Sequence, residues 1–347
     1  LSTTEGAKGR TGDAVTFITD TGPSRHVLAV MKIFQSVSTF ENELAALSRA
    51  GKWLLDEPNG IVVVPRALSA EFILLPGGST GGALIMTAAR GSPLDDLMLL
   101  TCRAAGGHRK ALFQRLINAV NLSAQAFYIL HTKHVSSSPR RTIISEAEEQ
   151  CSDIVGKIYR FLNEYDDEPR NMTKKILGTR GDILKQITTL SQNAKSNPGC
   201  GCVAHGDAHC GNVFVSDHEN TITLIDLESI NRSVGAKGEA IGSASEDLAN
   251  FTHKLGQGGR DWGLTDVEIG ELQVSCLSAY NANKDEAAGA NVSAEITPQQ
   301  LITQEMFDLF FCRRQLGEIH RKLVGNQSFT DATKAIVALR TTFSRIE

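Results

Sequence analysis

The most informative part of the chain reads Val203-Ala-His-Gly-Asp-Ala-His-Cys-Gly-Asn-Val-Phe-Val215, and Thr221-Ile-Thr-Leu-Ile-Asp-Leu-Glu228 follows shortly after it. Short runs typical of strands, at 201–203, 213–215 and 221–225, alternate with loops here. Two acids and an asparagine, Asp207, Asn212 and Asp226, therefore lie on consecutive loops. These loops predict the chemistry, and the segments on either side of them predict the fold.

The three polar residues carry the groups that phosphoryl transfer requires. The reaction needs an acceptor oxygen in line, a divalent metal on the phosphates and a carboxylate that orients the attacking hydroxyl. Mg²⁺ prefers hard oxygen ligands and usually takes one or two carboxylates together with water and phosphate. Asp207, Asn212 and Asp226 supply such oxygens.

The order of these residues resembles the signature of the aminoglycoside phosphotransferase and choline kinase family, within the protein-kinase-like fold. The residues that carry the resemblance are His205-Gly206-Asp207, Asn212 and Ile225-Asp226-Leu227-Glu228. The resemblance implies that Asp207 is the catalytic base and that Asn212 and Asp226 bind magnesium. It makes His205 a structural residue that braces the catalytic loop. Glu246-Asp247-Leu248-Ala249 is similar to a later segment of the family, in which Asp247 would support the metal-binding loop.

The N-terminal part contains segments similar to the nucleotide-binding parts of kinases. Lys32 ends the run Val27-Leu-Ala-Val-Met-Lys32, similar to a lysine-bearing kinase strand. Glu43 matches the family's Glu-x-x-x-Leu and would pair with Lys32, although Glu41 competes for this role on the same helix.

Three weaker similarities extend this match. Gly6-Ala-Lys-Gly-Arg-Thr-Gly12 has the glycine content of a loop whose amides cover phosphates, which makes Gly9 and Gly12 expected nucleotide contacts. The run from Ala83 to Gly91 resembles the segment that contacts adenine, which implicates Met86 and Ala88. Leu130-His131 resembles a Leu-His pair that this family has near the end of a long helix in the larger of its two lobes. The expected cofactors are ATP and Mg²⁺, with GTP an open alternative.

The pattern along the chain predicts an α+β, two-lobed fold. Residues 1–89 are expected to form a small β-rich nucleotide-binding lobe, and residues 90–347 a larger helical lobe for catalysis and substrate binding. Expected strands are 14–18 and 26–34, which form a hairpin, and 61–64, 71–75 and 83–87. Expected helices are 40–50, which ends at Gly51, and then 111–131, 146–165, 174–192 and most of the chain from 246 onward.

Composition narrows the class of protein. A net charge of −4 over 347 residues gives no support for nonspecific nucleic-acid binding. No uninterrupted apolar run is long enough for a membrane span, and the beginning of the chain lacks a basic segment followed by an apolar one, so we expect a cytoplasmic protein. The odd number of cysteines, 7 in all, predicts mostly free thiols in a reducing compartment.

An acidic stretch bears on the acceptor. From Asp261 to Asp308 the only basic residue is Lys284, against nine acids. Such a concentration of charge beside a cleft would attract a positively charged substrate. Together with the resemblance to the family, whose members place carboxylates around a positive substrate, this implies a small, cationic molecule with a hydroxyl group as acceptor, similar to an aminoglycoside or to choline. Solvated helix faces are the alternative explanation.

Several alternatives stay open. His209 and Cys210 lie in the variable part of the motif, where loop packing or a contact with the substrate is expected. Glu228 is either an acid beside the metal or a solvated strand end. A kinase fold that acts on a protein, or one that serves as a non-catalytic nucleotide-binding scaffold, is also compatible, although no Ala-Pro-Glu follows Asp226. A remote alternative is a zinc-stabilised binding module, whose ligands would be Cys200, Cys202, His205, His209 and Cys210.

Overall fold

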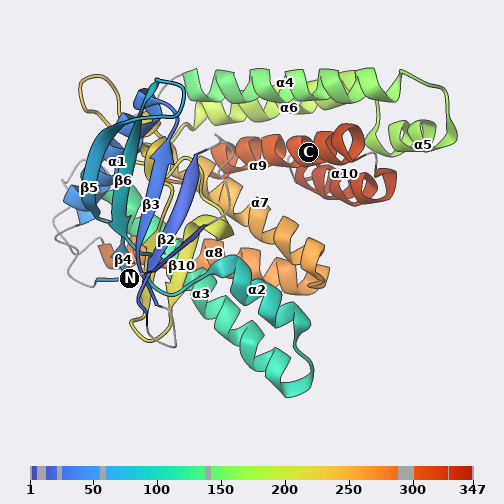
Figure 1. Cartoon of the computed structure of the whole chain (residues 1–347). Coiled ribbons are helices and arrows are strands. Elements are labelled where there is room, and N and C mark those ends of the chain that lie inside the picture. Colours follow the sequence, from blue (N-terminus) through green and yellow to red (C-terminus); the bar gives the residue numbers. More distant parts are fainter. Residues whose placement is uncertain are drawn as a thin grey trace.

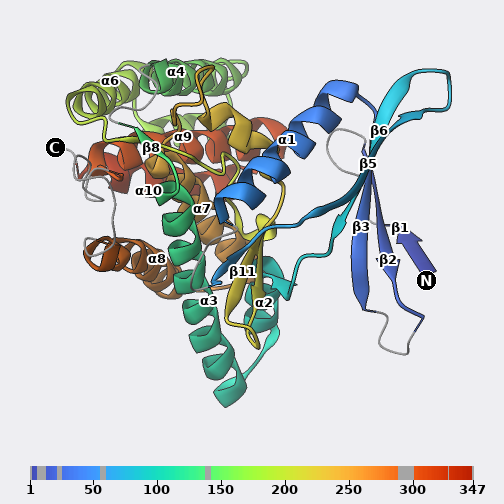
Figure 2. The same ribbon diagram turned by 90° about the vertical axis from the view of Figure 1, so that its left-hand side faces the viewer.

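The computed structural model of the chain describes residues 2–5, 13–21, 26–54, 60–136, 142–287, 301–326 and 328–345. A β-rich N-terminal part lies beside a larger helical part (Figures 1 and 2). This is the predicted α+β arrangement. Within the described residues, no helix combines the length and apolar character needed to cross a membrane.

The N-terminal part is an antiparallel sheet of five strands. Their order is β1 (Ser2–Glu5), β2 (Ala14–Thr19), β3 (Val27–Phe34), β6 (Thr80–Thr87) and β5 (Ala67–Leu74). The predicted hairpin is confirmed, because β2 pairs antiparallel with β3. Strand β1 was not predicted, since its sequence Ser-Thr-Thr-Glu lacks the apolar alternation of a half-buried strand.

Helix α1 (Val37–Leu54) contacts β3, β5 and β6. The predicted end at Gly51 is wrong, because the α-helix continues through Gly51 to Leu54. The apolar face runs on through the buried side chains of Leu47, Ala50 and Leu54. Tertiary packing of that face outweighs the cost of about 1 kcal/mol for one glycine inside a helix.

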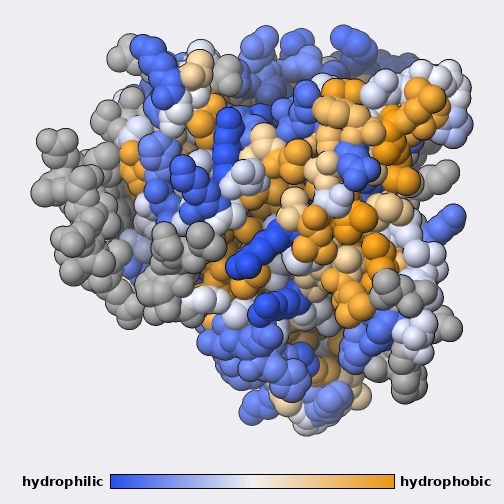
Figure 3. All heavy atoms as spheres, turned by 60° about the vertical axis from the view of Figure 1, so that its left-hand side comes forward, coloured by the Kyte–Doolittle hydropathy of each residue, from blue (hydrophilic) through white to orange (hydrophobic). Residues whose placement is uncertain are grey.

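Strand β5, at the edge of the same sheet, exposes apolar side chains to solvent. Leu68, Phe72 and Leu74 on β5 are 60%, 59% and 77% exposed. Apolar side chains also gather in a band across the face of the molecule shown in Figure 3. The core beneath this sheet therefore depends mainly on its packing with α1.

A second sheet carries the loops of the sequence motif. It has the order β4 (Val62–Val63), β11 (Thr221–Leu224), β10 (Val213–Ser216) and β7 (Ser92–Pro93). Strands β10 and β11 form the hairpin expected from the sequence. Strand β4 pairs in parallel with β11, so a strand from the first ninety residues belongs to the sheet of the catalytic region. A small antiparallel pair joins β8 (Val135–Ser136) to β9 (Gly201–Cys202), and β9 directly precedes the motif in sequence.

The remaining described elements are mostly helices. They are α2 (Leu94–Arg103), α3 (Gly106–Thr132), α4 (Thr142–Leu162), α5 (Glu168–Leu177), α6 (Arg180–Ser196), α7 (Ala244–Trp262), α8 (Asp266–Ala287), α9 (Gln304–His320) and α10 (Phe329–Phe343), with the 3₁₀ helices η1 (Cys210–Asn212) and η2 (Leu227–Ser233) and the π-helical turn η4 (Arg321–Gly325). The single helix predicted for 174–192 is wrong. The chain breaks at Gly178, which has φ +94°, and Thr179 then caps α6 by accepting a hydrogen bond from the Asp182 N–H.

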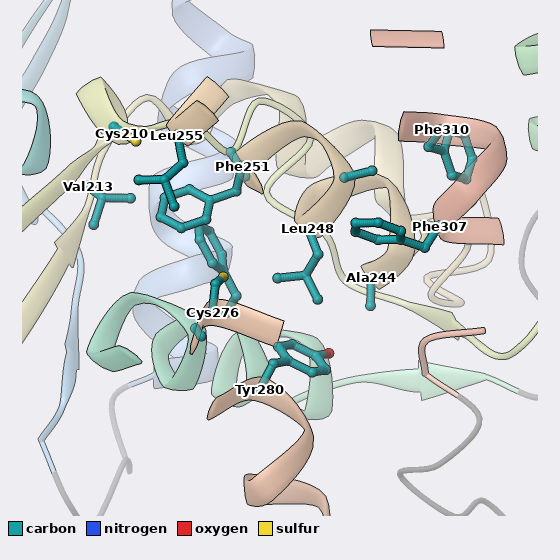
Figure 4. Packing of buried hydrophobic residues seen from close by; sticks show 14 of the residues in the cluster. Cys210, Val213, Ala244, Leu248, Phe251, Leu255, Cys276, Tyr280, Phe307 and Phe310 are labelled. Carbon is teal, nitrogen blue, oxygen red and sulfur yellow. The ribbon is translucent and has the colours of Figure 1, made fainter. Parts of the chain in front are cut away.

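Helix α7 runs through the centre of the helical core. Leu248, Phe251 and Leu255 are completely buried on it. Figure 4 shows these side chains between residues of α8 and α9. The Phe251 ring also meets Phe127 of α3 at a centroid distance of 5.1 Å. This packing fixes the position of the start of α7. The motif loop is attached to that end of the helix.

Candidate active site

Lys32 joins three distant segments of the chain. Its Nζ lies 3.2 Å from Oε1 of Glu43 on α1 and 3.1 Å from Oδ1 of Asp226, which directly follows Ile225 and β11. The sequence predicted the pairing of Lys32 with Glu43, and the structure contains it. Glu41 is exposed whereas Glu43 is only 2% exposed, so Glu43 is the residue of the two that faces Lys32.

The electrostatics of this group depend on burial. Burial opposes a positive charge on Lys32, but the carboxylates of Glu43 and Asp226 outweigh it and raise the pKa of the ammonium group. Burial also raises the pKa of Glu43, and Lys32 partly offsets that effect. A further carboxylate, Glu228, adds to the increase for Glu43 and therefore lies close to this cluster. Lys32 thus stays charged next to carboxylates, as a phosphate-binding lysine requires.

A clamp between α1 and η2 holds Glu43 in place. Asn231 on η2 donates a hydrogen bond from Nδ2 to the carbonyl oxygen of Asn42 (2.7 Å) and accepts one at Oδ1 from Arg49 (2.8 Å). The sequence did not identify Asn231, because nothing local distinguishes it from a loop asparagine. Its effect is to tie the helix that carries Glu43 to the segment that follows Asp226.

Asp226 has an unusual backbone conformation. Its φ and ψ are 60° and 53°, in the left-handed region that non-glycine residues rarely adopt. Its side chain is 48% exposed and makes no capping hydrogen bond to η2. Strain of this kind persists where the surroundings enforce it, which is common at functional sites. Here it directs the carboxylate toward Lys32.

Asp247 holds the motif loop, which begins at His205, through hydrogen bonds to its backbone. Its carboxylate accepts hydrogen bonds from the backbone N–H groups of His205 and Gly206 and contacts Nε2 of His131 at 3.0 Å. Burial acts to raise the pKa of Asp247, but the hydrogen bond and charge of His131 and the contacts with the loop keep it below its ordinary value. Asp247 therefore supports the loop of His205 and Gly206 rather than the metal-binding loop that the sequence analysis assigned to it, and His131 of Leu130-His131 contributes the imidazole.

His205 and Gly206 shape the loop itself. Nε2 of the completely buried His205 lies 2.9 Å from the carbonyl oxygen of Ile225, which links the motif loop to the residue before Asp226. Gly206 has φ +81°, and a Cβ there would lie 2.7 Å from Cβ of Ser229. Both the conformation and the space therefore require glycine at this position.

Asn212 links Asp207 to Ile225, the residue before Asp226. Its Nδ2 donates to the carbonyl oxygen of Asp207 (3.0 Å), and its own carbonyl oxygen accepts from the Ile225 N–H (3.1 Å). With Nδ2 engaged in this way, Oδ1 is left as an acceptor. An amide oxygen and the Asp226 carboxylate on adjoining segments form the type of hard donor set that magnesium prefers. The residues therefore fit Mg²⁺.

His209 and Cys210 are used by the loop. Nδ1 of His209 accepts a hydrogen bond from the Gly211 N–H (3.1 Å), and its Nε2 lies 3.8 Å from Oδ2 of Asp207. Cys210 is 2% exposed. Within the described ranges, no three His, Cys, Asp or Glu side chains are grouped as metal ligands, so the residues proposed for zinc are not brought together.

The other predicted nucleotide contacts are less defined. Met86 on β6 is buried at 5% exposure, and Ala88 follows this strand, with its N–H 3.4 Å from the carbonyl oxygen of Leu28. Gly9 and Gly12 lie outside the described residues. The roles of these four positions remain predictions.

Arg314 on α9 is a residue that the sequence analysis missed. In the described part of the chain its Nε is buried without a hydrogen-bond partner. Burial lowers the pKa of its guanidinium and Arg313 adds to this, whereas Glu246, Asp207 and Asp247 act in the opposite direction. The neighbouring Arg313 is engaged, since its Nη2 lies 2.6 Å from Oε1 of Glu246. Arg314 therefore brings a charge without an ion-pair partner among the described residues close to Asp207.

The buried Asn250 on α7 lies at the same level as Arg314. Neither Nδ2 nor Oδ1 of Asn250 has a hydrogen-bond partner among the described residues. Arg314 acts electrostatically on His253 and Glu246, which lie one turn after and one turn before Asn250 on α7. Helices α7 and α9, which pack against each other, thus hold polar atoms of Asn250 and Arg314 that described residues do not satisfy.

Three of the acids in the stretch from Asp261 to Asp308 contact other residues of the helical part. Glu268 forms a two-pronged ion pair with Arg109 of α3, with distances of 2.5 and 3.0 Å. Glu305 accepts a hydrogen bond from Asn197 (3.0 Å). Asp308 accepts one from Gln304 (2.9 Å). These contacts explain part of the acidic stretch as support for helix packing.

Comparison with known proteins shows the fold. No model of a known protein family matches the sequence, and no curated protein matches it by sequence. A glucosamine kinase in complex with glucosamine, ADP and inorganic phosphate is similar with a TM-score of 0.57 and 12% identity, over 96% of this chain and 80% of that chain. A crystal form of a glucosamine kinase, form B, gives 0.55 and 13%, over 96% and 79%. The predicted two-lobed, protein-kinase-like fold is thereby confirmed.

Proposed function

We propose that this protein transfers the γ-phosphate of Mg-ATP to a hydroxyl group of a small molecule. The observation that carries the proposal is the contact of Lys32 with both Glu43 and Asp226, at 3.2 and 3.1 Å. It joins the β-rich part to the end of the β10–β11 hairpin, and Asp207 and Asn212 lie in the segment directly before that hairpin. Phosphoryl transfer needs a cation on the phosphates beside a carboxylate that can hold a metal ion, and this group of charges can supply both.

Each residue has a distinct role in the proposed reaction. Lys32, oriented by Glu43, holds the nucleotide phosphates. Asn212 and Asp226 would hold magnesium, which would neutralise negative charge on the phosphates. Asp207 orients the acceptor hydroxyl and takes its proton as the oxygen attacks phosphorus. We further propose residues 1–89 as the nucleotide-binding lobe and residues 90–347 as the lobe for catalysis and acceptor binding.

The structural neighbours support this class of reaction. One of them is a glucosamine kinase that was solved in complex with glucosamine, ADP and inorganic phosphate. The resemblance of the motif to aminoglycoside phosphotransferases and choline kinases points to the same class. A small-molecule acceptor is therefore preferred over a protein acceptor, and both a cytoplasmic location and family membership remain part of the proposal.

Two features of the protein point to different charges on the acceptor. The acidic stretch and the family resemblance favour a cationic acceptor. Arg314 favours an acceptor with several hydroxyl groups or a carboxylate, because a guanidinium without an ion-pair partner among the described residues is suited to bind oxygen. An amino sugar combines an amine with hydroxyl groups and is compatible with both features.

The test is ADP release from Mg-ATP with a panel of amino alcohols, aminoglycosides, neutral sugars and hydroxy acids. Asp207→Asn serves as the control, since asparagine keeps the shape of the side chain and cannot accept the proton. We expect one class of acceptor to stimulate ADP release and the variant to lower it by roughly a hundredfold or more. Tight nucleotide binding without release for any acceptor would instead support a protein acceptor or a scaffold.

A further inference from the structure

The motif loop contains the same local arrangement twice. Nδ1 of His205 accepts a hydrogen bond from the backbone N–H of Asp207 at 3.3 Å, two residues further along the chain. Nδ1 of His209 accepts one from the N–H of Gly211 at 3.1 Å, again two residues further along. A ring nitrogen that accepts a hydrogen bond carries no proton, so each neutral ring has its proton on Nε2. Both histidines are therefore directed donors.

The two donors point to different acceptors. His205 uses Nε2 to reach the carbonyl oxygen of Ile225 at 2.9 Å, which is a formed hydrogen bond. Nε2 of His209 lies 3.8 Å from Oδ2 of Asp207, which exceeds hydrogen-bond length by less than 1 Å. The Asp207 side chain is 51% exposed and has room to turn. Hydrogen bonds of catalytic groups often shorten only when the substrate is bound.

The imidazole of His209 is held more firmly than the carboxylate that it faces. Its side chain is 32% exposed, compared with 51% for Asp207. A Cβ on Gly211 would lie 3.1 Å from Cε1 of His209 and equally close to Oδ2 of Asp95, so the ring packs against backbone with little free space. The ring therefore has a fixed direction, and Asp207 is the partner that moves.

The hydrogen bond that Nδ1 accepts from the Gly211 N–H is compatible with a neutral ring that has its proton on Nε2. A neutral ring donates a hydrogen bond to Asp207 without neutralising the carboxylate that must accept a proton.

We propose that His209 is a positioning residue for the catalytic carboxylate, an inference that rests on the proposed function. When the acceptor binds, Nε2–H of His209 donates to Oδ2 of Asp207 and fixes the carboxylate toward the acceptor hydroxyl. The O–H bond of the acceptor then breaks, its proton passes to Asp207, an O–P bond forms and the bond to ADP breaks. His209 keeps its own proton throughout.

Two substitutions separate this role from capping of the loop. In His209→Asn, the amide oxygen still accepts from the Gly211 N–H but the side chain is too short to reach Asp207. In His209→Gln, an N–H can be placed near the position of Nε2. We expect kcat to fall about ten- to hundredfold in His209→Asn, with an unchanged KM for ATP, and to stay within about threefold of wild type in His209→Gln. Wild-type kcat in His209→Asn, or equal losses in both variants, would overturn the proposal.

Two further measurements keep the inference separate from the proposed function. In an Asp207→Asn background, His209→Asn should cause no further loss of kcat, because its partner is already absent. Nitrogen NMR of the histidine rings, with the His209 signal assigned by its absence in His209→Asn, should show the proton on Nε2 in the wild-type protein. This reading needs no turnover. If no acceptor is phosphorylated, the proposed function fails, whereas a His209 ring protonated at Nδ1 overturns the positioning role.

Discussion

The two ends of the candidate active site differ in how their charges are satisfied. At the nucleotide end, Lys32 is already paired with Glu43 and Asp226, and Asn231 ties the helix that carries Glu43 to η2. At the acceptor end, Arg314 has no ion-pair partner among the described residues and Asp207 is half exposed. The protein therefore organises the nucleotide end by itself, whereas the acceptor end depends on what binds there. Substitutions at the two ends should separate them.

Asp226→Asn should have the largest effect. Asparagine tolerates the left-handed backbone and keeps the side-chain volume, but it removes the charge that faces both Lys32 and magnesium. We expect turnover to fall roughly a hundred- to thousandfold with little change in thermal stability. Steady-state kinetics over a range of Mg²⁺ concentrations and a melting curve test this. A folded Asp226→Asn enzyme with wild-type turnover and Mg²⁺ dependence would remove the nucleotide end from the mechanism.

Two further substitutions, Lys32→Ala and Glu43→Gln, test the nucleotide end and should differ in the size of their effect. Lys32→Ala should raise KM for ATP and lower kcat by about ten- to a hundredfold, because the cation on the phosphates is lost. Glu43→Gln should have a smaller effect, since Asp226 still holds the lysine. Exposed Glu41→Gln is the matched control and should behave as wild type. Steady-state kinetics with varied ATP and a fixed acceptor concentration measure these effects. Equal defects in Glu41→Gln and Glu43→Gln would contradict the assignment of Glu43 as the partner of Lys32.

Arg314→Gln addresses the acceptor end. We expect KM for the acceptor to rise about tenfold, as for loss of a charged hydrogen bond, while KM for ATP stays unchanged. Arg313→Gln is the comparison, because Arg313 is paired with Glu246 and its loss should appear mainly as a lower melting temperature. Kinetics with varied acceptor distinguish the two. If Arg314→Gln changes KM for ATP instead, the two ends are not separate in the sense proposed.

Glu268→Gln should have the smallest effect and depends on pH. The hydrogen bond from Arg109 lowers the pKa of Glu268 to about 2, with burial acting against it. The ion pair therefore stabilises the fold above the ordinary carboxyl pKa and loses this contribution as pH falls toward 2. We expect Glu268→Gln to cost on the order of 1 kcal/mol at pH 7 and the difference to vanish in acid, as followed by denaturant unfolding. A raised KM for cationic acceptors in this variant would instead place Glu268 in an acceptor-binding wall.

The sequence predicted the nucleotide end much better than the acceptor end. His205, Asp207, Asn212 and Asp226 lie within one short segment, so their order along the chain reports their arrangement. Lys32 and Glu43 are separated from it but lie on a strand and a helix with recognisable patterns. Arg314 has no such signal, because it comes from a helix about a hundred residues later and its proximity to Asp207 arises only from the packing of α7 on α9.

The fold shows the same division between local and long-range information. The break between α5 and α6 was predictable in principle, since Gly178 followed by Thr179 and Asp182 forms a stop and a cap. The strand β4 was recognised only as an apolar run. Its parallel partner β11 lies far away in sequence, and periodicity carries no information about which strand will pair with it.

The pairing of β4 with β11 also has a mechanical consequence. Because β4 lies between α1 and β5 in sequence, the chain enters the sheet of the catalytic region and returns to the N-terminal sheet. A second attachment lies after β6, where the Arg90 N–H donates to Oγ1 of Thr223 on β11 (3.2 Å). Both attachments reach the strand that ends before Asp226. A rotation of the N-terminal sheet relative to the helical part would therefore have its axis near β11 and would leave Asp226 almost stationary.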